Sequence, residues 1–128
     1  MNMVDASGWI EFFLAGPNGP KFKPVIEKTD ELLVTSINLY EVHRVLSRKL
    51  PAHLRATCLD LMRRAPVIDF TDARAIAAAD VSSKHQLAMA DAAMYAMALE
   101  HQATLWTQDA DYQGLAGVQY VSVSLRGA

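Results

Sequence analysis

Hydrophobic positions along the chain fall into short continuous runs that alternate with longer stretches of helical spacing. The runs are rich in β-branched and aliphatic residues and are bounded by turn residues, which is typical of buried strands. They predict five strands, at residues 3–4, 32–35, 67–71, 105–107 and 118–123.

The longer stretches predict helices because their apolar residues recur every three or four positions, as Leu39, Val42, Leu46 and Leu50 do. Ser7 is the expected cap of the first helix. A Gly- and Pro-rich segment at residues 16–20 is expected to be a loop. The helices are predicted at residues 8–14, within 22–28, at 37–50, from Pro51 to about 64, from Asp72 to 79, and at 87–102.

Strands separated by helices predict right-handed crossovers and a parallel sheet covered on both faces. No shift in composition marks a second domain, so we expect one domain over residues 1–128. In such sheets, ligands bind beyond the carboxyl ends of the strands, where the strand order reverses.

Composition narrows the class of protein. The 128 residues are 52% hydrophobic and 20% charged, which excludes a disordered chain. The net charge of −2 argues against a uniformly basic coat for nucleic acid. A single cysteine, Cys58, excludes an internal disulfide framework and fits a cytoplasmic protein. The acidic start and the short apolar stretch at 87–99 predict neither a signal peptide nor a membrane span.

Four acidic residues occupy unusual places. Asp5 and Asp109 directly follow predicted strands, Glu41 lies one turn into the helix after the second strand, and Asp91 is the only charged residue between 87 and 99. Each has an ordinary explanation as a helix cap, a loop acid or one half of an i,i+3 ion pair. A parallel sheet would bring all four to one edge, however, where they repel unless cations neutralise them. Oxygen ligands alone favour Mg²⁺ or Mn²⁺ over zinc.

Four motifs in this order resemble those of the PIN-domain ribonucleases, specifically the VapC-type toxins of toxin–antitoxin pairs. They cover essentially the whole chain: Asp5-Ala6-Ser7, the segment 37–42 with Glu41, the segment 87–93 with Asp91, and the segment from Thr107 to Tyr112. The chain departs from the usual pattern in two places. Ala6 stands where a hydroxyl residue is frequent, and Tyr112 stands where phenylalanine is more usual.

The resemblance implies an α/β protein with a three-layer α/β/α PIN-like fold and a central, mainly parallel sheet of about five strands. It also implies a homodimer, metal-dependent endonucleolytic cleavage of RNA, and inhibition by a cognate antitoxin. The expected Mg²⁺ or Mn²⁺ ligands are Asp5, Glu41, Asp91 and Asp109, with Asp111 as a further candidate. Hydrogen bonds to these carboxylates or to bound water are expected from Ser7, Thr107 and Asn38.

Charge is unevenly distributed along the chain. Residues 1–64 hold nine Lys and Arg against seven acids, and the remainder holds three against seven. The candidates for RNA contact are therefore basic residues of the first half: Lys21, Lys23, Arg44, Arg48 and Lys49. The four histidines show no paired metal-ligand spacing and are expected in surface or packing positions.

Two short segments carry more large apolar residues than one sheet layer needs: Trp9, Phe12, Phe13, Met89, Met94, Tyr95 and Met97. We expect part of this surface to form a two-fold dimer, and the part around residues 9–13 to receive an antitoxin helix. That antitoxin should also place an arginine or lysine in the acidic site. The alternative is that these residues simply fill the core of one chain.

Other functions fit the sequence less well. A receiver domain needs an acidic pair after the first strand and a lysine after the last, whereas Val4 precedes Asp5 and residues 121–124 contain no lysine. A haloacid-dehalogenase-type phosphatase needs Asp-x-Asp, but position 7 is Ser7. The alternative that stays open is a PIN-like module that binds RNA or protein without cleaving it.

Overall fold

The computed structural model describes residues 1–123 and contains one five-stranded sheet in the order β3-β2-β1-β4-β5. Every neighbouring pair of strands is parallel. The strands are β1 (Asn2–Val4), β2 (Leu32–Thr35), β3 (Val67–Ile68), β4 (Thr104–Thr107) and β5 (Val118–Tyr120). The chain starts in the centre of the sheet, builds outward through β2 and β3, and then returns to the other side of β1. The strand order therefore reverses between β1 and β4.

Side chains that alternate along the central strands divide the apolar residues into two cores. Met3 and Leu105 point to one face of the sheet, whereas Val4 and Val34 point to the other. This is the two-residue period expected of a strand that is covered on both faces.

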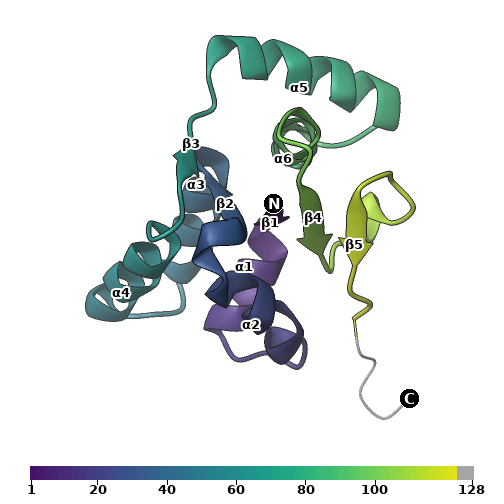
Figure 1. The fold of residues 1–128 in the computed structure, drawn as a ribbon. Coiled ribbons are helices and arrows are strands. Elements are labelled where there is room, and N and C mark those ends of the chain that lie inside the picture. The colour runs from purple at the N-terminus through teal and green to yellow at the C-terminus, as the bar shows by residue number, and fades with distance from the viewer. Residues whose placement is uncertain (124–128) are drawn as a thin grey trace.

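Helices cover both faces of the sheet (Figure 1). The core on the Val4 side is closed by α1 (Ala6–Phe13), α2 (Gly19–Glu27), α3 (Ser36–Leu46) and α4 (Ala52–Met62). The core on the Met3 side is closed by α6 (Met89–Glu100), which packs against the long α5 (Asp72–His85). Two short 3₁₀ turns, Thr29–Glu31 and Ala110–Tyr112, complete the structure. The predicted three-layer α/β/α fold is confirmed.

Several predicted helix ends were wrong, because individual residues and hydrogen bonds near those ends decide where a helix begins and ends. The cap of α1 is Asp5 and not Ser7, because the Asp5 carboxylate accepts the Gly8 backbone N–H. Helix α2 begins at Gly19, inside the expected loop, since proline is tolerated in a first helical turn. Thr35 and Asn38 form a capping box that starts α3, and α3 already ends at Leu46.

The second half of the chain differs in similar ways. Strand β3 has only two residues, because the Phe70 N–H turns away to the Ser36 hydroxyl. Helix α5 is capped by Thr71 and runs six residues beyond Ala79, until Gln86 adopts a left-handed conformation with φ 55°. Helix α4 stops at Met62, and the ladder of β5 ends at Tyr120.

The set of apolar residues expected on a shared surface is mostly core. Trp9, Met94, Tyr95 and Met97 are at most 2% exposed, so the alternative of a filled single-chain core holds for them. They are buried because α5 covers α6 and because α2 and α3 pack against α1. Met89, at 76% exposed, is the clear exception.

The helices of residues 1–123 are too short or too polar to cross a membrane.

Candidate metal centre

The four acids predicted to gather at one edge of the sheet line a single pocket of about 230 Å³. Asp5 follows β1, Asp109 follows β4, Glu41 comes from the second turn of α3, and Asp91 comes from the first turn of α6. The pocket thus lies at the carboxyl ends of β1 and β4, where the strand order reverses. Its other lining residues are apolar or neutral: Ala6, Ser7, Ile10 and Tyr112.

Asp5 is the best-held of these acids. Its Oδ1 accepts the Ser7 hydroxyl at 2.7 Å and the Gly8 N–H at 3.1 Å, and its Oδ2 accepts the Thr107 hydroxyl at 2.7 Å. Burial nevertheless raises the pKa of Asp5 to about 6, although these three hydrogen bonds oppose the rise. The expected contacts of Ser7 and Thr107 with a carboxylate are therefore present. Asp5 also caps α1, so the same carboxylate both starts a helix and lines the pocket.

Glu41 and Asp91 both have raised pKa values, as expected of partly buried acids that form no ion pair. Burial, followed by the negative charges of Asp91 and Asp5, raises the pKa of Glu41 to about 7, and Arg44 only partly offsets this. Burial and the charge of Asp109 raise the pKa of Asp91 as well. No residue that lines the pocket is basic, and the described residues give neither acid an ion pair.

Asp91 is not the cap of α6, because Ala88 holds that place. It lies in the first turn of the helix, half-buried, facing a pocket on one side and the core on the other. Tyr112 donates its hydroxyl to the Asp91 backbone carbonyl at 3.0 Å and to Oδ1 at 3.3 Å. The sequence predicted no specific contact for Tyr112. The only available signal was a hydroxyl at a position where the resemblance leads one to expect phenylalanine.

Within residues 1–123, the close group of acids that could share one ion does not include Asp5 or Glu41. One carboxylate oxygen each of Asp91, Asp109 and Asp111 lies within 4.8 Å of the others. Asp109 accepts the Asp111 N–H at 2.9 Å and so caps the 3₁₀ turn that follows it. Asp111 is exposed and does not line the pocket.

Asn38 does not take the place expected for it. Its Oδ1 accepts the Thr35 N–H at 3.1 Å, and its Nδ2 donates to the Val4 carbonyl at 3.2 Å. Asn38 therefore ties the start of α3 to β1 instead of contacting a carboxylate. This position is fully buried, so the polar side chain must find partners in the backbone around it.

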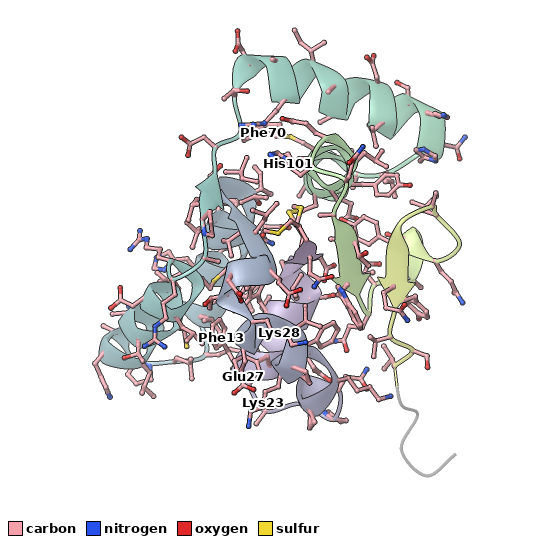
Figure 2. The ribbon with its side chains drawn as sticks, viewed as in Figure 1. Phe13, Lys23, Glu27, Lys28, Phe70 and His101 are labelled. Atoms are coloured by element: carbon pink, nitrogen blue, oxygen red, sulfur yellow. The ribbon has the colours of Figure 1, made fainter. Side chains whose placement is uncertain are left out.

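The basic candidates for RNA contact are all exposed: Lys21, Lys23, Arg44, Arg48 and Lys49. Arg44 acts on the pocket directly, because its charge lowers the pKa of Glu41. Lys21 and Lys23 lie on α2, and Figure 2 shows Lys23 at the lower end of the molecule. Arg48 and Lys49 follow the end of α3.

The donor set fits a hard divalent cation. Four carboxylates, three of them with raised pKa values, face one pocket that contains no thiolate, imidazole or ammonium group. Mg²⁺ and Mn²⁺ prefer such oxygen ligands, and the charge of a cation would oppose the burial and the repulsion that raise these pKa values.

The sequence profile of the PIN domain family matches residues 3–118. No curated protein sequence matches the chain.

Solved structures share the fold at low sequence identity. A toxin–antitoxin complex from Klebsiella pneumoniae aligns with a TM-score of 0.80 and 19% identity, covering 96% of this chain and 100% of that chain. The sarcin-ricin loop cleaving toxin VapC20 of Mycobacterium tuberculosis aligns with a TM-score of 0.75 and 17% identity, over 96% and 98% of the two chains. DNA-bound VapBC from Salmonella typhimurium aligns with a TM-score of 0.75 and 17% identity, covering 95% of this chain and 98% of that chain. Together with the profile match over nearly all of the sequence, these results establish that the chain belongs to the PIN domain family.

Proposed function

We propose that this protein is a metal-dependent endoribonuclease and the toxin of a type II toxin–antitoxin pair. The observation that carries the proposal is a pocket of four acids, none with an ion pair in residues 1–123, at the point where the strand order of a PIN-domain sheet reverses. The similarity to structures described as toxins, one of which is named for cleaving the sarcin-ricin loop, supports the choice of RNA as substrate.

We propose Asp5, Glu41, Asp91 and Asp109 as the residues that hold Mg²⁺ or Mn²⁺, with Asp111 as a further candidate. When bound, such a cation supplies an activated water and neutralises charge on the phosphate and on the leaving oxygen. Asp5 is preorganised for this task by Ser7 and Thr107.

The residues around the pocket would also position the RNA. Arg44 is exposed and close enough to Glu41 to stabilise its charge, so it is the basic residue best placed for a phosphate next to the scissile one. Lys21 and Lys23 on α2 and Arg48 and Lys49 after α3 would contact phosphates farther along the strand.

An antitoxin would close this site in the proposed pair. A groove of about 450 Å³ between α1 and α2, lined by Phe12, Pro17, Pro20 and Lys23 among others, could receive an apolar helix. A basic residue of the same partner would enter the acidic pocket and replace the charge of the cation. One structural neighbour is described as a toxin–antitoxin complex, and others are described as DNA-bound VapBC2, VapBC and FitAB, which supports such a partner.

A homodimer is part of the proposal, with a surface that keeps Met89 from the set of residues expected for it. Met89 and Tyr40, exposed at 76% and 67%, flank an apolar pocket of about 390 Å³ between α3 and α6. Light scattering at micromolar concentration would report twice 14.1 kDa for the dimer and 14.1 kDa if this part of the proposal is wrong.

The test of the function is cleavage of end-labelled transfer and ribosomal RNA by the purified chain. We expect discrete products with Mn²⁺ and none after EDTA is added. Binding of RNA without any cleavage at millimolar Mn²⁺ would instead favour the alternative of a PIN-like binding module.

A further inference from the structure

Tyr112 has an unusual position for a fully buried residue. Its ring packs into the core beneath α6, with its centre 6.5 Å from that of Tyr95, yet the residue also lines the acidic pocket. It ends the 3₁₀ turn that Asp109 caps, so the same short turn carries an acid and a phenol to the site.

The phenol of Tyr112 is a neutral hydrogen-bond donor, and it lines the same pocket as the four acids. It can bind a carboxylate without removing the negative charge that a cation needs.

The acids differ in how firmly they are held. Asp5 accepts three hydrogen bonds, whereas Tyr112 is the only donor that residues 1–123 provide to the carboxylate of Asp91. Asp91, like Asp109, belongs both to the pocket of four acids and to the close trio of Asp91, Asp109 and Asp111. A change in its side-chain orientation would therefore affect both groupings.

We propose that Tyr112 is a positioning residue for the cation site. Its hydroxyl bridges the backbone carbonyl and Oδ1 of Asp91, which fixes the carboxylate relative to α6 and leaves the second oxygen free for the cation. The inference rests on the proposed function, because it assigns Asp91 to the metal. Groups that orient a ligand in this way typically change metal affinity by about 10- to 100-fold when they are removed.

A purely structural role is the competing explanation. Tyr112 could simply tie the turn to α6 through the Asp91 carbonyl. The chain offers a matched control, because Tyr95 of α6 is also buried and donates its hydroxyl to the Ala116 carbonyl at 2.7 Å, away from every acid of the pocket. Tyr112→Phe and Tyr95→Phe each remove one hydroxyl and one contact with a backbone carbonyl. Only Tyr112→Phe also frees a carboxylate.

The experiment is a Mn²⁺ titration of the full chain, followed by the electron paramagnetic resonance signal of free Mn²⁺. The wild type, Tyr112→Phe and Tyr95→Phe are compared after their thermal unfolding has been recorded. We expect Tyr112→Phe to raise the dissociation constant of Mn²⁺ about 10-fold and Tyr95→Phe to leave it within about 2-fold. In RNA cleavage, Tyr112→Phe should shift half-saturation by Mn²⁺ by the same factor and recover most of the rate at saturating metal.

Four outcomes would overturn the inference. Equal affinity in the wild type and Tyr112→Phe would show that Asp91 needs no positioning, although the proposed function would survive. Equal losses in both variants would assign the effect to packing. A wild type that binds no Mn²⁺ would refute the inference and the proposed function together. If Tyr112→Phe unfolds while Tyr95→Phe does not, the essential role is structural and the inference also fails.

Discussion

The two ends of helix α6 each carry an acid, and the two acids have opposite surroundings. Glu100 in the last turn accepts two hydrogen bonds of 3.0 Å from Arg74 of α5, and this contact lowers its pKa. Asp91 in the first turn has no basic partner in residues 1–123, and burial raises its pKa. The fold supplies a counter-charge to Glu100 at the surface, and within residues 1–123 it supplies none to Asp91 at the proposed cation site.

The largest expected effect is on the rate of RNA cleavage, which should depend on Asp91 and not on Glu100. Asp91→Asn should lower the rate of RNA cleavage at least about 100-fold, because removing a ligand costs no less than removing a group that orients one. Glu100→Gln should leave the rate near that of the wild type. Rates from gel assays at fixed Mn²⁺ check this, and equal rates for Asp91→Asn and the wild type would contradict the assignment of Asp91.

The next largest effect is expected in how much metal stabilises variants of Asp91 and Glu100. A cation that binds only the folded state at 100 times its dissociation constant adds about 2.7 kcal/mol of stability. In a chain of this size, that raises the unfolding temperature by about 10 °C. We expect this shift with Mn²⁺ for the wild type and for Glu100→Gln, and little of it for Asp91→Asn. Differential scanning calorimetry with Mn²⁺ or EDTA measures it, and a full shift in Asp91→Asn would place the ion elsewhere.

The metal-free protein should lose stability as the pH rises. The pKa values of Asp5 and Glu41 are about 6 and about 7 when folded, against 3.8 and 4.5 in an unperturbed chain. Between pH 4 and 7 the folded protein therefore binds more protons than the unfolded chain, so the free energy of unfolding falls across this range. Each kcal/mol lost lowers the unfolding temperature by about 4 °C.

Glu41→Gln in EDTA tests this sign. The variant cannot ionise at position 41, so its unfolding temperature should fall less between pH 5 and pH 8 than that of the wild type. Asp91→Asn should likewise hold or gain stability at pH 8, since one repelling charge is gone. A steeper fall in Glu41→Gln would show that the carboxylate stabilises the empty site.

The smallest effect is expected at the paired end of α6. Arg74 and Glu100 lie at the surface, where solvent screens an ion pair. Glu100→Gln should therefore change the unfolding temperature only slightly, and 0.5 M NaCl should reduce even that difference. A large destabilisation that persists in salt would mean that this contact holds α5 on α6.

The sequence predicted the strands better than the helix ends. Continuous runs such as residues 32–35 are buried on both faces, so their hydrophobicity alone reveals them. Helix ends depend on individual hydrogen bonds, such as those that Asp5 and Thr71 accept, and several residues near each end can act as caps. The sequence left open whether α6 is buried within one chain or between two chains, because only the packing of α5 shows what covers it.

In the candidate metal centre, too, some features were predictable from the sequence and others were not. The convergence of four acids was predictable, because the carboxyl ends of parallel strands share one edge. Hydrogen-bond partners were less so. Ser7 and Thr107 contact a carboxylate as expected, whereas Asn38 bonds to backbone and Tyr112 reaches Asp91 across 21 positions of sequence. Such contacts depend on side-chain directions that sequence spacing does not encode.

The most direct test of the account is the position of the ion itself. Crystals grown with Mn²⁺ and measured for anomalous scattering should show a peak about 2.0–2.3 Å from carboxylate oxygens of Asp5 and Asp91, with Glu41 and Asp109 around it. Such a peak would establish a cation site at Asp91, in the first turn of α6. A peak absent from this pocket at saturating Mn²⁺, or one bound only by exposed acids such as Asp111, would contradict the central claim.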